Sequence, residues 1–179
     1  MSSGFVIGPE RSLARTSVLH LVEAELTLPD GSTSPRIIAR HPGAVAVVPI
    51  DAHGTVILVR QFRVALDIDL LEIPAGKRDV PDEPLETTAQ RELAEEIGFV
   101  AGTLELLTAF IPTPGFCDEV VHIYRGTDLS AVDRNVQTAE EQYMSIERWP
   151  LEEAVAAVHR GEVPDAKTAI GLLLAHARP

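Results

Sequence analysis

Apolar side chains in the first part of the chain recur at every second position, the period of a strand with one buried face. The pattern is clearest across residues 18–28 and returns at residues 36–39, on either side of a Pro-Asp-Gly-Ser turn at 29–32. These segments predict an N-terminal β-hairpin, with a shorter segment before it. A hairpin alone is only marginally stable, so this one must pack on the rest of the chain or on a second copy.

Further strands and helices follow from the same patterns. Residues 44–50 and 55–60 are rich in valine and isoleucine and flank a turn sequence at 51–54, which predicts a second hairpin in the core. Strands are also predicted in four shorter segments: 69–73, 103–110, 120–125 and 142–147. Residues 151–160 and 165–177 are alanine- and leucine-rich and predict two packing helices.

One helix is expected to carry most of the chemistry. Its apolar positions repeat every four residues, at Leu85, Ala89, Leu93 and Ile97. Pro84 suits the first turn of a helix and Gly98 suits a helix stop, so the pattern predicts an amphipathic helix that begins at Pro84 and ends at Gly98.

Three glutamates, Glu92, Glu95 and Glu96, fall on one face beside that apolar stripe because their spacing is i, i+3 and i+4. Like charges at these spacings destabilise a helix unless a cation lies between them. A hard divalent ion such as Mg²⁺ or Mn²⁺ takes carboxylate oxygens and bridges to substrate phosphates. The alternative is a solvated acidic face, the usual role of a run of charges.

Composition narrows the class of protein. The chain has 179 residues, 45% of them hydrophobic, which suits one globular domain with a small appendage. A net charge of −12 argues against nucleic-acid binding. The single Cys117 excludes an intrachain disulfide, and no apolar segment is long enough to cross a membrane, so we predict a cytoplasmic protein without a membrane partner.

The helix and the loop before it together resemble the Nudix box, the signature of hydrolases that cleave a nucleoside diphosphate linked to another group. The matching positions are Gly76, Glu83, residues 91–93 (Arg-Glu-Leu), residues 95–96 (Glu-Glu) and Gly98. Six residues separate Gly76 from Glu83, where the usual pattern has five. The resemblance implies an α/β fold, a Nudix-type α/β/α sandwich with a mixed sheet at residues 41–179. Residues 1–40 would form a small N-terminal β-hairpin subdomain through which the protein forms a homodimer.

Segments before the box are similar to the ADP-ribose pyrophosphatase branch of this family. The Gln-Phe-Arg segment at 61–63 implies that Arg63 contacts the pyrophosphate, and Arg60 is a weaker candidate. The Leu-Glu-Ile-Pro-Ala-Gly segment at 71–76 implies a metal ligand in the Ala75 carbonyl and a place near substrate for Glu72 and Gly76. Without the resemblance, the arginines could instead pair with surface acids and the glycine could belong to an ordinary turn.

A proline-rich loop after the box completes the similarity. Pro114 lies sixteen residues beyond Gly98 and begins Pro-Gly-Phe-Cys-Asp-Glu, which is similar to the catalytic loop of the ADP-ribose branch and makes Glu119 the candidate general base. Glu119 could equally be an acid at the start of the next strand. The acidic pair at 140–141 is a further candidate near the metal, or a charge pair at a strand entry.

The resulting hypothesis is Mg²⁺-dependent hydrolysis of the pyrophosphate of ADP-ribose, giving AMP and ribose 5-phosphate. The metal ligands would be the Ala75 carbonyl, Glu92, Glu95 and Glu96, with Glu95 also counted beside Glu119 as catalytic. Another nucleotide sugar or nucleoside diphosphate derivative is an alternative substrate, since the box does not specify the leaving group. A nucleotide-sensing module without catalysis is the alternative from another class.

Overall fold

The computed structural model describes residues 4–134 and 141–178, except for the side chain at 141. The predicted acidic pair at 140–141 lies outside this description, since Glu140 and the side chain of Glu141 are not among the described parts. The chain divides into two compact units. The first ends at Gly43 and also takes in Ile111–Val120, and the second comprises Ala44–Phe110 and the chain from Val121 onward.

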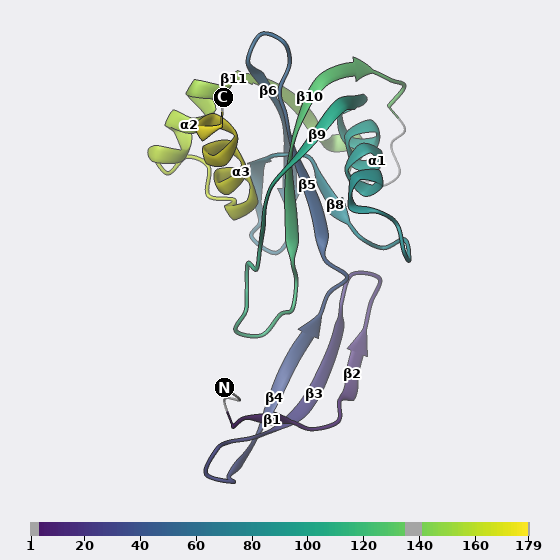
Figure 1. Cartoon of the computed structure of the whole chain (residues 1–179), viewed down its shortest axis with the longest axis vertical. Coiled ribbons are helices and arrows are strands. Elements are labelled where there is room, and N and C mark those ends of the chain that lie inside the picture. The colour runs from purple at the N-terminus through teal and green to yellow at the C-terminus, as the bar shows by residue number, and fades with distance from the viewer. Residues whose placement is uncertain (1–3, 135–140, 179) are drawn as a thin grey trace. The chain divides into compact units, whose positions relative to one another are not determined.

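The N-terminal unit is a four-stranded antiparallel sheet (Figure 1). Its strands are β1 (Val6–Ile7), β2 (Arg11–Arg15), β3 (His20–Thr27) and β4 (Thr33–Arg40). The predicted hairpin is the β3–β4 pair, and β1 and β2 share the other edge of β3. Every residue of β2 is exposed, so this strand has no buried face to produce an alternating pattern.

The second unit holds two sheets. One is mixed, in the order β8-β5-β10-β9, with β5 and β10 parallel and the other pairs antiparallel, and the second is antiparallel, in the order β11-β6-β7. The strands are β5 (Ala44–Pro49), β6 (Thr55–Arg63), β7 (Ile68–Glu72), β8 (Ala75–Lys77), β9 (Phe99–Phe110), β10 (Val121–Ala131) and β11 (Ser145–Pro150).

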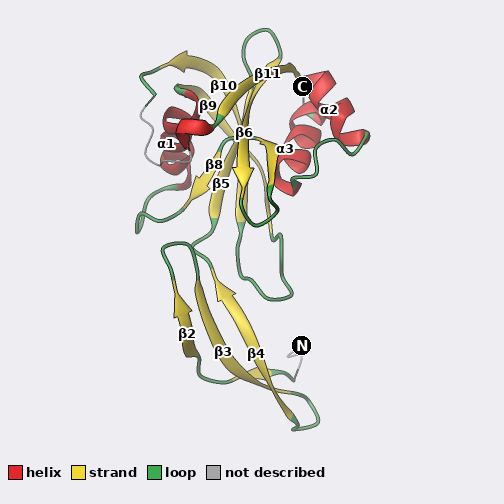
Figure 2. Ribbon diagram, turned by 180° about the vertical axis from the view of Figure 1, so that it is seen from behind, coloured by secondary structure: helices red, strands yellow, loops and turns green. Residues whose placement is uncertain are grey.

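Helices cover the strands of this unit on both sides (Figure 2). They are α1 (Leu85–Ile97), α2 (Leu151–His159) and α3 (Ala166–Ala177), with a short 3₁₀ turn, η1, at Glu141–Tyr143. Helix α1 lies on one side, and α2 and α3 lie together on the other (Figure 1). The expected α/β/α sandwich with a mixed sheet is confirmed.

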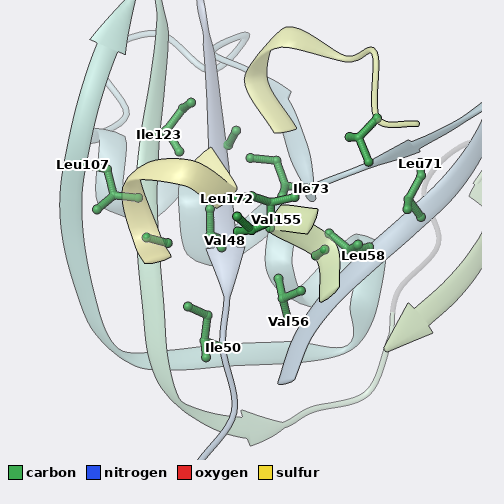
Figure 3. Packing of buried hydrophobic residues seen from close by; sticks show 14 of the residues in the cluster. Val48, Ile50, Val56, Leu58, Leu71, Ile73, Leu107, Ile123, Val155 and Leu172 are labelled. Carbon is green, nitrogen blue, oxygen red and sulfur yellow. The ribbon is translucent and has the colours of Figure 1, made fainter. Parts of the chain in front are cut away.

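Strand β5 shows why two apolar layers form. Val45 and Val47 pack with the α1 cluster, whereas Ala46 and Val48 pack with the cluster beneath α2 and α3. Figure 3 shows the second cluster, in which Val48 lies close to Leu172 of α3. Alternate side chains point to opposite faces of a strand, so a continuous apolar run supplies both layers.

The turn of the predicted β5–β6 hairpin forms, but the predicted pairing of the two strands was wrong. The turn itself forms, with Asp51 N donating to Thr55 O at 3.0 Å, but only one bridge follows, between Ile50 and Val56. Both edges of β5 are taken by β8 and β10, and both edges of β6 by β7 and β11. The two strands therefore separate into different sheets.

No helix within residues 4–134 and 141–178 is both long and apolar enough to span a membrane.

Candidate active site

Helix α1 begins and ends where the sequence predicts. Pro84 caps its start with an extended backbone, and Gly98 ends it in the left-handed conformation at φ 71°. In that conformation Gly98 N donates to Ala94 O at 3.1 Å, a common way to close a helix. The helix packs its apolar stripe into the core together with two of its carboxylates.

Those two carboxylates are buried rather than solvated. Glu92 is 8% exposed and Glu96 is 7% exposed, while Glu95 is half-buried. The solvated-face interpretation is therefore wrong for Glu92 and Glu96. Burial raises the pKa of Glu92 to about 7, and the negative charges of Glu95 and Asp79 add to that rise while Arg91 opposes it.

Gly76 lies directly against the Glu92 carboxylate. It is the central residue of β8 and pairs with Val45 of β5, so the ordinary-turn interpretation is wrong. A Cβ atom at Gly76 would lie 1.9 Å from Glu92 Cδ and 2.1 Å from each carboxylate oxygen. Only glycine allows the strand and this carboxylate to approach so closely.

The neighbouring residue in β8 contacts the second buried carboxylate. Ala75 N donates a hydrogen bond to Glu96 Oε2 at 3.1 Å, while Val47 N donates to Pro74 O at 2.9 Å. Residues 74–76 are thus held between α1 and β5. The Ala75 carbonyl and the two carboxylates come from a short stretch of strand and one helix face that contact each other.

Arg91 lies among the acidic groups of α1. Its guanidinium is 2.7 Å from Glu92 Oε1, 3.1 Å from Glu83 Oε2 and 3.5 Å from Glu95 Oε2. The pair with Glu95 has the i, i+4 spacing of neighbours on a helix face. The hydrogen bond from Arg91 is also the main reason that the pKa of Glu83 is lowered, so Glu83 belongs to a network with Arg91 and Thr88.

These donors suit a hard divalent cation by their chemistry. They are carboxylate and carbonyl oxygens, and burial, the main cause of the raised pKa of Glu92, makes its negative charge costly without a cation beside it. In the described residues no three acidic, histidine or cysteine side chains are grouped closely enough to hold a metal. Arg91 is the countercharge that pairs with Glu92 and Glu95 in this structure.

A second charged group lies at the ends of β6 and β7. Arg63 Nε and Nη2 donate to the two oxygens of Glu72, each at 2.6 Å, and Glu72 is 1% exposed. Lys167 of α3 also binds Glu72, and its Nζ lies 3.0 Å from Asp165 Oδ2. Lys167 was not predicted as a site residue, because its Asp-Ala-Lys-Thr context in the sequence signals only a helix start.

Arg60 has the surface partner that the alternative interpretation of the arginines described. Its Nε donates to Glu147 Oε1 at 2.6 Å, and Trp149 Nε1 donates to the other oxygen of Glu147 at 3.0 Å. Both members of the ion pair are partly exposed. A substrate role for Arg60 stays a prediction.

The loop with Pro114 and Glu119 belongs to the N-terminal unit. Ala39 N donates to Phe116 O at 2.7 Å and Asp118 N donates to Ala39 O at 3.2 Å, so the loop is hydrogen-bonded to β4. Asp118 also accepts from His41 N at 2.8 Å.

Within this loop Pro114 is exposed, and Glu119 Oε1 lies 3.6 Å from His41 Nδ1. The roles of Pro114 and Glu119 stay predictions.

The chain is similar to a known domain family and to proteins of known name. The model of the NUDIX domain matches residues 40–169. The chain is 42% identical over 155 residues to the ADP-ribose pyrophosphatase of Bacillus subtilis (strain 168), covering 87% of this chain and 83% of that protein. It is 37% identical over 155 residues to the methanol dehydrogenase activator of Bacillus methanolicus, with the same coverage of 87% and 83%.

A crystal structure of an ADP compounds hydrolase has the same fold. It superposes with a TM-score of 0.83 at 24% identity, covering 97% of this chain and 92% of that one.

Proposed function

Because this chain belongs to the family defined by the NUDIX domain, we propose that it is a Mg²⁺-dependent pyrophosphatase that hydrolyses ADP-ribose to AMP and ribose 5-phosphate. Nudix hydrolases generally use a divalent metal ion. The observation that carries the proposal is the contact of the buried Glu92 carboxylate with Gly76, beside the hydrogen bond from Ala75 N to Glu96. The likeness to the Bacillus subtilis ADP-ribose pyrophosphatase supports the choice of substrate.

The Ala75 carbonyl, Glu92, Glu95 and Glu96 are the groups that would hold the metal. When bound, divalent ions neutralise phosphate charge and lower the pKa of a coordinated water. The carboxylates lie on a helix face and the carbonyl on a strand that touches it, so both parts of this ligand set come from regular elements rather than from loops.

The remaining steps belong to the protein's own side chains. Arg63 is 42% exposed and donates to the phosphate that is not attacked, because a guanidinium presents donors in a fixed planar fork. Glu119 takes a proton from the attacking water as its oxygen bonds to phosphorus and the bridging P–O bond breaks. With a net charge of −12, the chain needs such placed cations to accept an anionic substrate.

The test is a panel of nucleoside diphosphate derivatives assayed with and without Mg²⁺, with phosphatase-coupled phosphate release as the readout. We expect metal-dependent turnover, fastest with ADP-ribose. Faster turnover of another nucleotide sugar would change the proposed substrate but not the proposed reaction. An absence of metal-dependent turnover for every member would refute the proposal.

Substitutions in α1 test whether turnover depends on the proposed metal ligands. Glu92→Gln and Glu96→Gln should each lower kcat by orders of magnitude, since each removes a charged oxygen donor from the metal. Glu86→Gln is the matched control, because Glu86 is exposed near the start of the same helix. Near-normal rates in Glu92→Gln would show that the metal binds elsewhere, and wild-type kcat in Glu119→Gln would remove Glu119 as general base.

A second candidate function is binding without hydrolysis. The similarity to a protein named methanol dehydrogenase activator gives a reason to test it. Calorimetric binding of ADP-ribose in the presence of Mg²⁺, without any turnover, would favour such a module over the enzyme.

We further propose that the N-terminal sheet mediates a homodimer, as expected from the sequence. Exposed apolar side chains on this unit support it, among them Val6, Ile7 and Ile37. Light scattering should then give twice the chain mass of 19.4 kDa. The cytoplasmic location stays a prediction from the sequence.

A further inference from the structure

Lys167 is a largely enclosed cation with no role in the reaction proposed above. Its side chain is 14% exposed, and it contacts the carboxylates of Glu72 and Asp165. Glu72 is itself 1% exposed and already receives two hydrogen bonds from Arg63. A single bidentate guanidinium is a good partner for a carboxylate, so the second cation calls for an explanation.

The charged cluster formed by Arg63, Glu72, Asp165 and Lys167 has an inner and an outer end. Lys167 is enclosed, whereas the Arg63 side chain is 42% exposed. Arg63 uses Nε and Nη2 for Glu72, and within the described part of the chain Nη1 makes no hydrogen bond. The pKa of Arg63 is raised, chiefly by its hydrogen bonds to Glu72 and also by the charge of Glu96 on α1.

The first turn of α3 fixes the position of Lys167. Asp165 caps the helix by accepting from Thr168 N at 3.0 Å. Thr168 Oγ1 in turn accepts from Ile73 N at 2.9 Å, and Thr168 is fully buried. This bond ties α3 to the residue that follows Glu72, so Lys167 reaches Glu72 from a rigid base.

We propose that Lys167 is a positioning residue, which holds the Glu72 carboxylate so that Arg63 keeps a fixed orientation with one edge of its guanidinium available to a substrate phosphate. The inference rests on the proposed function, in which Arg63 binds the phosphate that is not attacked.

Charge and geometry both give Lys167 this role. With Lys167 bound, Glu72 shares its negative charge between two cations, and Arg63 retains attraction for an anion. Without Lys167, Glu72 would neutralise Arg63 alone, and its carboxylate would lose the contact that fixes its rotation. Buried charged groups need such complete pairing, because an unmatched one is costly.

The test is the kinetics of Lys167→Met and Lys167→Arg with ADP-ribose and Mg²⁺. Losing a charge-assisted contact is expected to raise KM by about tenfold or more in Lys167→Met, with little change in kcat. Lys167→Arg should bring KM back to within about threefold, because it retains the charge and the hydrogen bonding. Arg160→Met is the control, since Arg160 pairs with Glu162 at an exposed site.

A purely structural role would give a different pattern. Destabilisation alone would lower the folded fraction, and kcat per total protein would fall in Lys167→Met while KM stayed constant. That result, or wild-type kinetics in folded Lys167→Met, would overturn the inference. If Lys167→Met does not fold, Lys167→Gln replaces it, with the same expected rise in KM.

A second readout separates this inference from the proposed function. The Nε–H resonance of Arg63, assigned by its loss in Arg63→Lys, should shift and broaden in Lys167→Met but not in Arg160→Met. This measurement needs no turnover, so it decides the role of Lys167 even if the wild-type protein hydrolyses nothing in the panel. An unchanged resonance would overturn the inference.

Discussion

A single methyl group at Gly76 should disable the site, although alanine can adopt the backbone conformation that Gly76 has in β8. The Cβ of an alanine would lie 1.9 Å from Glu92 Cδ. Carbon atoms pack at about 3.5 Å, so the carboxylate or the strand must move by about 1.6 Å. Moving Glu92 also breaks its 2.7 Å contact with Arg91.

The size of the effect follows from that displacement. Inserting a methyl into a packed region costs about 1–3 kcal/mol of unfolding free energy. A misplacement of about 1 Å in a catalytic group can lower the rate by about 100-fold, and we expect kcat of Gly76→Ala to fall by at least that much. The required Mg²⁺ concentration should rise as well, because Glu92 is a proposed ligand.

The assay combines kcat across a Mg²⁺ titration with unfolding in urea. The matched comparison is a double-mutant cycle with Glu92→Ala, which empties the space that the methyl would enter. In that background Gly76→Ala should change the unfolding free energy by less than about 0.5 kcal/mol. Wild-type kcat in Gly76→Ala, or an undiminished stability loss in the Glu92→Ala background, would refute the reasoning.

Three further predictions concern the surroundings of the site. Thr168→Val removes the acceptor of the buried Ile73 N–H, so urea unfolding should show a loss of about 1–3 kcal/mol, and a change within error would contradict the importance of this bond. The hydrogen bond from Arg60 lowers the pKa of Glu147, so this pair stabilises the fold above pH 4.5 and loses that effect as the pH falls through the lowered value. Glu147→Gln should therefore be less stable than wild type at pH 7, by up to about 1 kcal/mol because the pair is partly exposed. The difference should be smaller at pH 3, and an equal difference at both pH values would contradict this. Asp118→Ala removes the acceptor for His41 N and should speed protease cleavage near Phe116, whereas an unchanged cleavage rate would show that the backbone bonds to Ala39 suffice.

The elements that the sequence predicts well are those specified by neighbouring residues. Helix α1 has its start signal, apolar period and stop within residues 84–98, and the structure has Pro84 as its N-cap and Gly98 as its C-cap. The pairing of β5 with β10 depends on residues more than 70 positions away, such as Val45 with His122. The local turn at 51–54 was therefore read correctly, while the partners of the strands beside it were not.

Within the candidate site, the sequence identifies residue types but not their environments. Three glutamates at helical spacing fit either a solvated face or a ligand set, and only packing shows that Glu92 and Glu96 are buried. Lys167 is 95 positions from Glu72, and no periodic pattern connects the two. Ion pairs of this kind arise from the tertiary fold, so a single sequence carries little signal for them.

The segment Ile111–Val120 has a consequence for how the chain is made and how it can be cut. This segment is synthesised between β9 and β10, yet it completes the N-terminal unit through its hydrogen bonds with Ala39. During synthesis on the ribosome, β4 must wait for some 77 further residues before Phe116 emerges to accept from Ala39. For the same reason, removing the first 43 residues would strip this segment of its hydrogen-bonding partners, so a single cut after Gly43 would divide the N-terminal unit rather than remove it whole.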